Sequence, residues 1–477
     1  MSSVKVDNAE PVIEHHVLPN LDYKPKDIQA SKFKYFGVSP ETASTFNLSA
    51  GAVTQTRFSI PRSNIYLFSR SCLVFDLLLP TAGGGNFARC FVDRPPISSM
   101  RLTTRSGTEL LNIDNFGYYW KMTRCQTPRS VYINNGYIGA ADTVANAAAT
   151  GNVCSFHNPG KDQAVGIGLT NNTKIDAAGA SSRLAPMATF SQQIIMASDA
   201  NAALAMRCKI PFGQLNGTIL ACPKDLPCTE DLILEIGWAP YSSFTFINTT
   251  AVDNLAAGLA AYAPAGNVVL SALKMILCVE ADLKIQTTIN DDVLNNLVAI
   301  PFPYSRIVQK DAVAANTTKN SNFVITSQVG SNLLRVMSCE FDQAEANKTS
   351  HNAFNINGAR TAAIKINVNG NDMDSTQSPG YHEDYVVQSS LLDNSAADEF
   401  DFYAVCPVTV TAFAGNVTNL TSSTYDDYDK INGADLSSNS VQFARTVSTS
   451  GVASNILVLA QGQKYLRIGN GSMKLAF

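Results

Sequence analysis

The feature that most constrains this 477-residue chain is a pattern that occurs twice. The stretch RFSIPRSNIYLFSRSCLVFD, from Arg57 to Asp76, is echoed about 265 residues later by NFVITSQVGSNLLRVMSCEFD, from Asn322 to Asp342. Each copy opens with a phenylalanine and an isoleucine two residues apart and crosses a polar hinge. Each then ends with a cysteine, a phenylalanine and an aspartate.

A hairpin pattern repeats at nearly the same spacing. In the first half, ISSMRLTTRSGTELL contains an alternating strand and a turn at Ser106-Gly107. In the second half, AIKINVNGNDM contains another alternating strand and a turn at Asn369-Gly370. Both dipeptides suit the positive φ angles of tight hairpin turns. An aromatic cluster follows each hairpin, so the order of features predicts two copies of one β-domain.

The remaining periodicity is that of an all-β protein. Short runs of β-branched and aromatic residues alternate apolar with polar positions and are bounded by Gly, Pro, Asn and Ser. Examples are AMRCKIPFG, DLILEIGWAP, LKMILCVEADLKI, FDFYAVCPVTVTAF and NILVLAQ. Two short helices are predicted, one in NIDNFGYYWKM and one in NDDVLNNLV, the second capped by Asn290.

These patterns predict three parts of the chain. Residues 1–50 form an N-terminal arm, residues 51–286 a first jelly roll with a long loop insertion at about 137–205, and residues 287–477 a second jelly roll. The arm has little periodicity, so we expect it to extend over a neighbouring subunit. Deleting residues 1–45 should then leave the fold intact but weaken assembly. The insertion contains the strand-like FSQQIIMA, and we interpret it as a surface excursion.

Composition favours contacts between copies over nucleic-acid binding. Charged residues make up 16% of the chain and the formal net charge is −4, so there is no basic field for a nucleic acid. The N-terminus carries no signal-peptide pattern, and secretion by that route is not expected. The uncharged stretch 254–273 is rich in Ala and Gly and contains Pro264, which favours a loop over a membrane-spanning helix.

Few residues have the spacing of a catalytic or metal site. The five histidines have no partners at ligand spacing, and we interpret His382, beside Glu383 and Asp384, as part of a charged surface loop. The acidic clusters Asp291-Asp292 and TYDDYDK lack the glycine and glutamate of a calcium loop. The ten cysteines, including the pair Cys222 and Cys228, are expected to be reduced structural thiols. We therefore assign no catalytic, cofactor-binding or metal-binding residue.

The strand pattern resembles that of double jelly-roll major capsid proteins from eukaryotic DNA viruses, particularly polinton-like viruses and virophages. The resemblance rests on the block from Arg57 to Pro80, the hairpin block from Ile97 to Met122, and their partners in the second half. It implies an all-β fold of two tandem eight-stranded jelly rolls with long surface loops. It also implies a homotrimer of pseudo-hexagonal outline that tiles an icosahedral virion, in contact with neighbouring capsomers and with minor capsid or penton proteins.

The competing hypothesis is a secreted or surface protein on the same architecture that binds glycans or acts as a glycan amidase. It would need acidic and aromatic residues that converge between the two rolls. The candidates are Tyr381–Asp384 and Tyr425–Asp429. Because the sequence shows no enzyme motif and no signal peptide, a structural, non-enzymatic capsid protein is favoured.

Overall fold

The computed structural model describes residues 32–48, 54–79, 87–92, 95–124, 153–157, 185–188, 193–198, 204–240, 245–249, 268–295, 298–342, 363–368, 371–372, 409–412, 434–437, 440–449, 453–469 and 471–476. Most of these residues lie in β-strands that form five sheets. In the described part, no helix is long and apolar enough to cross a membrane.

Two sheets face each other in the first half of the chain. The β16 sheet has eight strands: β1 (Phe33–Val38), β2 (Phe46–Leu48), β4 (Asn64–Tyr66), β5 (Cys72–Leu79), β10 (Ala185–Ala188), β12 (Leu204–Pro211), β13 (Leu226–Cys228) and β16 (Val268–Glu280). The β14 sheet has four: β3 (Thr54–Ile60), β7 (Ile97–Thr104), β8 (Glu109–Asp114) and β14 (Leu232–Trp238).

Two further sheets face each other in the second half. The β25 sheet contains β17 (Val298–Val313), β19 (Asn332–Asp342), β22 (Thr409–Ala412), β23 (Ala434–Asp435), β25 (Ser454–Gly469) and β26 (Ser472–Ala476). The β24 sheet contains β18 (Thr318–Ile325), β20 (Ala363–Val368), β21 (Asn371–Asp372) and β24 (Val441–Ser448).

The two halves share one strand connectivity, which is that of a jelly roll. In the first half the order β1-β16-β5-β12 lies opposite β3-β14-β7-β8, and in the second half β17-β25-β19-β22 lies opposite β18-β24-β20-β21. When only these eight strands of each half are numbered from 1 to 8 along the chain, both halves have the order 1-8-3-6 in one sheet and 2-7-4-5 in the other. Eight strands in two sheets with this long-range order form a jelly roll. The predicted duplication of an all-β fold is therefore confirmed.

The echoed segments form the same local structure in both rolls. Each runs from a strand through a 3-10 helix into another strand, which lies in the opposite sheet, and the first copy also has the short strand β4 before its 3-10 helix. The 3-10 helices are η4 (Phe68–Arg70) and η10 (Ser327–Val329). The polar hinge of the sequence pattern is thus the corner at which the chain crosses from one sheet to the other.

Period-2 alternation explains how the strands bury one face. Strand β18 alternates exposed and buried side chains along its second half, with Phe323 and Ile325 in the core. Strand β24 supplies Val441, Phe443 and Val447 to the same core. Because the two strands are paired side by side, their inward residues meet and form the interior of the second roll.

The N-terminal boundary lies earlier than the sequence indicated. Strand β1 pairs with β16 along its whole length, and β2 pairs with another part of the same strand. Phe36, Val38 and Phe46 pack against the first core. Residues 33–48 therefore belong to the first roll of their own chain, and deleting residues 1–45 would remove a strand from it. Residues 1–31 lie outside the described residues, so the arm itself stays a prediction.

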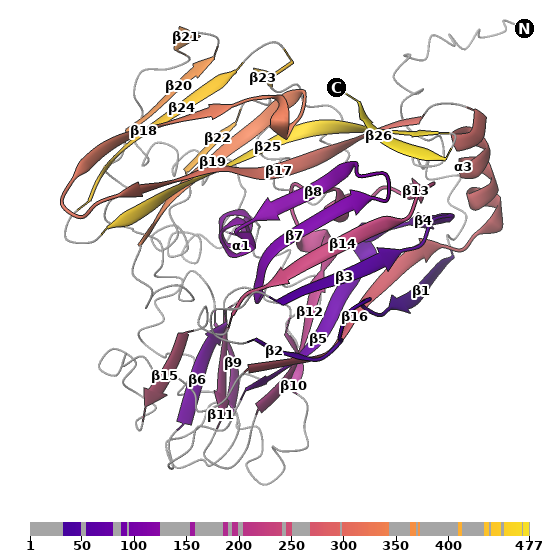
Figure 1. Cartoon of the computed structure of the whole chain (residues 1–477), viewed down its shortest axis with the longest axis horizontal. Coiled ribbons are helices and arrows are strands. Elements are labelled where there is room, and N and C mark those ends of the chain that lie inside the picture. The colour runs from indigo at the N-terminus through magenta and orange to yellow at the C-terminus, as the bar shows by residue number, and fades with distance from the viewer. Residues whose placement is uncertain are drawn as a thin grey trace, which may run out of the picture.

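Helices are few among the described residues, and one differs from its prediction. Helix α1 (Phe116–Arg124) confirms the first expected helix. The second, α3 (Leu283–Asn295), begins seven residues before Asn290, because Asp282 accepts hydrogen bonds from the backbone of its first turn. The expected boundary between residues 286 and 287 falls inside α3, which lies at one edge of the molecule (Figure 1). The other 3-10 helices are η7 (Phe212–Gln214) and η8 (Ile219–Ala221).

A fifth sheet lies apart from both rolls. It contains β6 (Phe87–Val92), β9 (Val153–His157), β11 (Gln193–Ser198) and β15 (Thr245–Thr249) in the order β15-β6-β11-β9. These strands come from three different connections of the first roll, and Figure 1 shows them gathered below it. The strand expected in FSQQIIMA is β11, so that part of the 137–205 insertion is ordered into this appended sheet.

Candidate functional site: the junction between the two rolls

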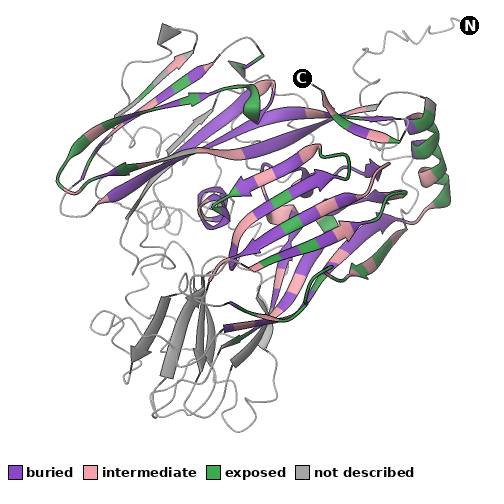
Figure 2. Ribbon diagram, in the orientation of Figure 1, coloured by how far each residue is buried: buried purple, intermediate pink, exposed green. Residues whose placement is uncertain are grey.

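The junction between the rolls brings together residues that are far apart in the chain. Strand β25 is buried on both faces along most of its length (Figure 2). One face carries Ile456 and Val458 into the core of the second roll. The other carries Leu457 and Leu459 into a cluster that is continuous with the core of the first roll. The two rolls therefore share one apolar interface.

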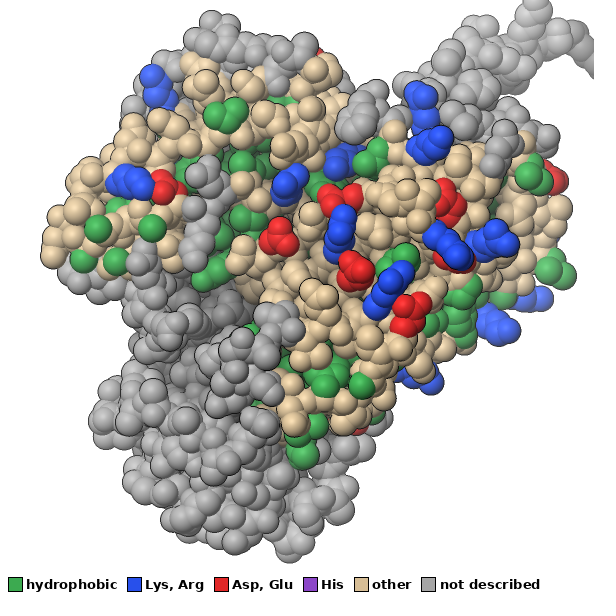
Figure 3. Space-filling view, in the orientation of Figure 1, with side chains coloured by type: hydrophobic (Ala, Val, Ile, Leu, Met, Phe, Trp, Pro, Cys, Tyr) green, Lys and Arg blue, Asp and Glu red, His purple; other side chains and the backbone are tan. Residues whose placement is uncertain are grey.

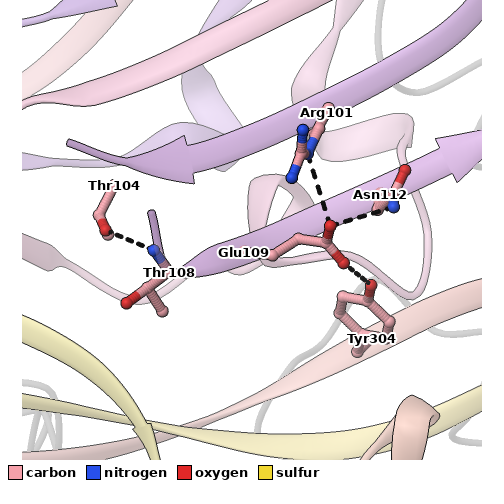
Figure 4. A network of polar contacts seen from close by, with 6 residues as sticks. All are labelled: Arg101, Thr104, Thr108, Glu109, Asn112 and Tyr304. Atoms are coloured by element: carbon pink, nitrogen blue, oxygen red, sulfur yellow. Dashed lines mark hydrogen bonds and ion pairs between the residues drawn. The ribbon is translucent and has the colours of Figure 1, made fainter. Parts of the chain in front are cut away.

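Glu109 is the centre of a polar network at this junction (Figure 4). It begins β8 in the first roll, and its Oε1 accepts a hydrogen bond of 2.7 Å from the Tyr304 hydroxyl of β17. Its Oε2 accepts a hydrogen bond of 3.0 Å from Asn112 and lies 3.5 Å from the Arg101 Nε. Tyr304 is fully buried. Glu109 therefore provides the acceptor that a buried tyrosine hydroxyl requires.

Lys464 adds a buried cation to the same junction. Its Nζ lies 3.3 Å from the centre of the Tyr304 ring, as in a cation–π contact. Only 7% of Lys464 is exposed. Burial lowers the pKa of Lys464 to about 8, and the negative charge of Glu109 opposes that shift. Desolvation therefore outweighs the attraction of the nearest carboxylate.

A second polar chain crosses the interface a few residues away. Arg335 Nε donates to the Gln461 side chain, and Gln461 Nε2 donates to Ser305 Oγ at 2.8 Å. Ser305 Oγ in turn donates to the Gly217 carbonyl of the first roll at 2.7 Å. The first three side chains are buried. Gly217 has a φ of +75°, and a Cβ there would lie 2.5 Å from Ser305 Oγ, so the close approach requires glycine.

We expect Glu109 and Tyr304 to be energetically coupled across the two rolls. Glu109→Ala should cost about 2 kcal/mol, because it leaves a buried hydroxyl without an acceptor, and Tyr304→Phe should cost about 1 kcal/mol. In the double variant the losses should not add, with a coupling of roughly 1 kcal/mol. Urea unfolding of the four proteins measures this coupling.

The control cycle uses Arg105 and Asp231, an ion pair of 3.2 Å within the first roll whose arginine side chain is 77% exposed. Its coupling should stay below about 0.5 kcal/mol. Strict additivity at Glu109 and Tyr304 would show that the hydrogen bond does not connect the rolls energetically.

A buried acidic pair lies beside α3. Asp225 is 5% exposed and Glu280 is 1% exposed. Glu280 Oε1 accepts hydrogen bonds from the backbone of Ala281 and Asp282. Burial, followed by the negative charge of Glu280, raises the pKa of Asp225 to about 7, while Arg70 opposes the shift. Near neutral pH, Asp225 therefore changes between its protonated and its ionised form.

This pair predicts a pH-dependent stability. An aspartate with a raised pKa binds more protons in the folded than in the unfolded state, so the free energy of unfolding falls as the pH rises from about 4. The full stability is present below pH 4, and the loss is complete once the pH has risen through 7. Asp225→Asn should therefore stabilise the protein at pH 8 by on the order of 2 kcal/mol and change little at pH 4.5. Urea unfolding at both pH values, with the exposed Asp291→Asn as control, measures the difference. An equal effect of Asp225→Asn at both pH values would contradict the assignment.

Most residues considered for chemistry from the sequence lie outside the part of the chain that the structure describes. Tyr381–Asp384, Tyr425–Asp429 and four histidines lie outside the described residues, and His157 ends β9. Asp291 and Asp292 lie on α3. Cys222 and Cys228 are buried, as expected of structural thiols. Among the described residues, no three His, Cys, Asp or Glu side chains are close enough to hold a metal ion.

The outer faces of the two smaller sheets differ in charge. On the β14 sheet, Glu235 is paired in register with Arg57 on one side and Arg101 on the other. Arg57 lies 3.2 Å from Glu41, so opposite charges alternate across the face, as Figure 3 shows. The exposed residues of the β24 sheet are mainly uncharged, among them Asn320, Asn322, Val324 and Gln442.

Comparison with known proteins identifies the fold. No family model matches the sequence, and a search of curated proteins finds no match. Among solved structures, the chain is similar to PBCV-1 VP54 fitted into a reconstruction of the virophage Sputnik, with 13% identity, 94% of this chain and 98% of that chain covered, and a TM-score of 0.53.

Two further structures have the same architecture. The Sputnik virophage structure gives 12% identity, coverage of 96% and 92%, and a TM-score of 0.53. The Faustovirus major capsid protein gives 11% identity, coverage of 95% and 93%, and a TM-score of 0.52. The chain therefore has the double jelly-roll fold of viral major capsid proteins, which confirms the resemblance seen in the sequence.

Proposed function

We propose that this chain is a major capsid protein whose trimers form pseudo-hexagonal capsomers that tile an icosahedral shell. The observation that carries the proposal is the pair of jelly rolls with identical connectivity, joined through an interface that is buried and hydrogen-bonded. Such a junction fixes the angle between the rolls, so each chain acts as one unit. Three such units would present six similar rolls around one axis.

The likeness to viral capsid structures supports this role over an enzymatic one. A capsid protein acts through the surface that it buries between copies rather than through reacting side chains. The low charge content of the chain suits this role, because buried interfaces are depleted of charged residues. Neighbouring capsomers, together with minor capsid or penton proteins, would be its partners, and the virion its location.

The appended sheet has a natural place in this arrangement. Its strands are drawn from connections of the first roll and add to neither jelly-roll sheet. We assign it to a projection at one end of the capsomer, where it is available for contacts outside the shell. The glycan hypothesis would place binding residues between the rolls, but the described junction is filled by apolar and hydrogen-bonded side chains.

Electron microscopy of the purified protein tests this function. Class averages should show particles with a six-sided outline and three-fold symmetry, and concentrated samples should form curved or closed sheets of them. Two-lobed single particles at every concentration would contradict the proposal.

A further inference from the structure

Strand β1 and the start of helix α3 meet at one residue, Glu280. Glu280 ends β16, and its Oε1 accepts hydrogen bonds of 2.9 Å and 2.8 Å from the backbone N–H groups of Ala281 and Asp282. The Ala281 N–H also donates to the Lys32 carbonyl at 2.7 Å, directly before β1. The Gln286 side chain of α3 donates to the Glu280 carbonyl. The position of Glu280 therefore fixes the backbone that holds both elements.

The other oxygen of the same carboxylate has no donor in the described part of the chain. Glu280 is 1% exposed, and its Oε2 is buried without a hydrogen-bond partner. A buried carboxylate oxygen in this state is costly, so a donor is expected. Asp225 is the neighbouring acid: burial and the negative charge of Glu280 raise its pKa to about 7. A protonated Asp225 would supply the missing donor.

One cation lies close to the pair without neutralising it. The positive charge of Arg70 in η4 opposes the raised pKa of Asp225. Its guanidinium, however, lies 4.3 Å from the centre of the Phe33 ring of β1, and among the described residues it forms no ion pair with Asp225 or Glu280. The other titratable or charged groups on the surrounding elements are Tyr35 of β1, Lys224 before β13, Cys228 of β13, Cys278 of β16, and Asp282, Lys284 and Asp292 of α3. Glu280 and Arg70 are the charges that shift the pKa of Asp225.

Strand β1 is suited to detach while the rest of the roll stays folded. It pairs with β16 alone, and none of its six residues is fully buried. Strand β5, by contrast, pairs with β12 on one side and β16 on the other, and it carries Leu73, Phe75 and Leu77 into the core. Elements with few buried contacts open at a lower free energy than global unfolding requires.

We propose that Asp225 and Glu280 share one proton, and that its loss at alkaline pH lets strand β1 and the start of α3 detach together from the first roll. Without this proton, two negative charges face each other in a buried site. Arg70 is then drawn toward Asp225 and away from the Phe33 ring, and Glu280 no longer holds the backbone at the start of α3. The device lies within one chain, so it does not depend on the proposed function.

Hydrogen–deuterium exchange of the full chain tests the proposal, with protection factors that correct for the pH dependence of the intrinsic exchange rate. Peptides that cover residues 33–38 and 281–286 should lose protection by about 100-fold between pH 5 and pH 8.5. This factor follows from linkage for an aspartate whose pKa is about 7 in the closed form and 3.8 in the open form. At pH 8.5 the protection of residues 72–79 in β5 should remain higher than that of both peptides.

Three variants identify the group that controls the opening. Asp225→Asn keeps a donor beside Glu280 at every pH, so the loss of protection at residues 33–38 and 281–286 should disappear. Asp291→Asn, at an exposed position on α3, is the matched control and should behave as the unaltered chain. Glu280→Gln covers the case in which Asp225→Asn does not fold: its amide can donate to an ionised Asp225, so it too should abolish the loss.

Each of three results would overturn the proposal. Protection of residues 33–38 and 281–286 that does not change with pH would show that no proton holds these elements. An equal loss in Asp225→Asn and in the unaltered chain would assign the opening to another group. Equal protection of residues 33–38 and 72–79 at both pH values would show that β1 opens only when the whole roll unfolds.

Discussion

Replacing Gly462 with alanine should destabilise the second roll by about 3 kcal/mol, at the upper end of what an inserted methyl group costs in a packed core. A Cβ at this position would lie 2.5 Å from the Val329 carbonyl oxygen and 2.8 Å from the Asn332 carbonyl oxygen. Both are backbone atoms, so no side chain can rotate away. The corner at η10 would have to move away from β25.

The control for Gly462 is Gly107→Asn. Gly107 has a φ of +95°, which asparagine tolerates better than other residues with a side chain, and no atom lies within 4 Å of a Cβ there. This variant should cost less than about 1 kcal/mol. Urea unfolding at one fixed protein concentration compares the two. Equal midpoints would contradict the close approach of η10 and β25.

Trp238→Ala should cost about 4 kcal/mol, because it removes one of the two tryptophan side chains of the first core. The ring lies 5.3 Å from Phe75, edge to face, and 5.8 Å from Phe46. Its Nε1 donates a hydrogen bond of 2.8 Å to the buried hydroxyl of Thr56. The residue thus links both sheets of the first roll and satisfies one of its polar groups.

Trp238→Phe separates these contributions. It keeps an aromatic ring against Phe75 but leaves the Thr56 hydroxyl without this donor, and we expect a loss of about 2 kcal/mol. Val324→Ala, at an exposed position, should change stability by less than about 0.5 kcal/mol. Denaturant unfolding measures all three. A loss at Trp238→Ala no greater than that at Val324→Ala would exclude this packing role.

The duplication could be predicted because each copy of the repeated pattern is a short, continuous stretch of sequence. Cys72 and Asp342 belong to segments whose order of aromatic, hinge and apolar residues is visible in one pass along the chain. Those segments became strand, 3-10 corner and strand in both rolls. The hairpin at Ser106-Gly107 also formed, with Gly107 at positive φ, as the dipeptide indicated.

The junction could not be predicted in the same way. Glu109 and Tyr304 are 195 residues apart, and neither stands in a motif. One signal was present: the run ILVLA in β25 is apolar at every position, which is typical of a strand buried on both faces. The run alone does not identify the first roll as the partner that covers the second face.

The two boundary errors have separate physical causes. Strand β1 contains Lys34 and Gly37 and buries no residue fully, so it lacks the pattern of a core strand. The start of α3 contains Thr287 and Thr288, which favour strands by propensity. The spacing of Ile285, Ile289 and Val293 by four residues was the helical signal that outweighed them.

The solution mass of the purified chain, measured by light scattering over a range of concentrations, tests the central claim most directly. The proposed function predicts a stable species of about three times 51.1 kDa, in which duplication within the chain gives a trimer six similar rolls. A species of 51.1 kDa at every concentration would contradict it.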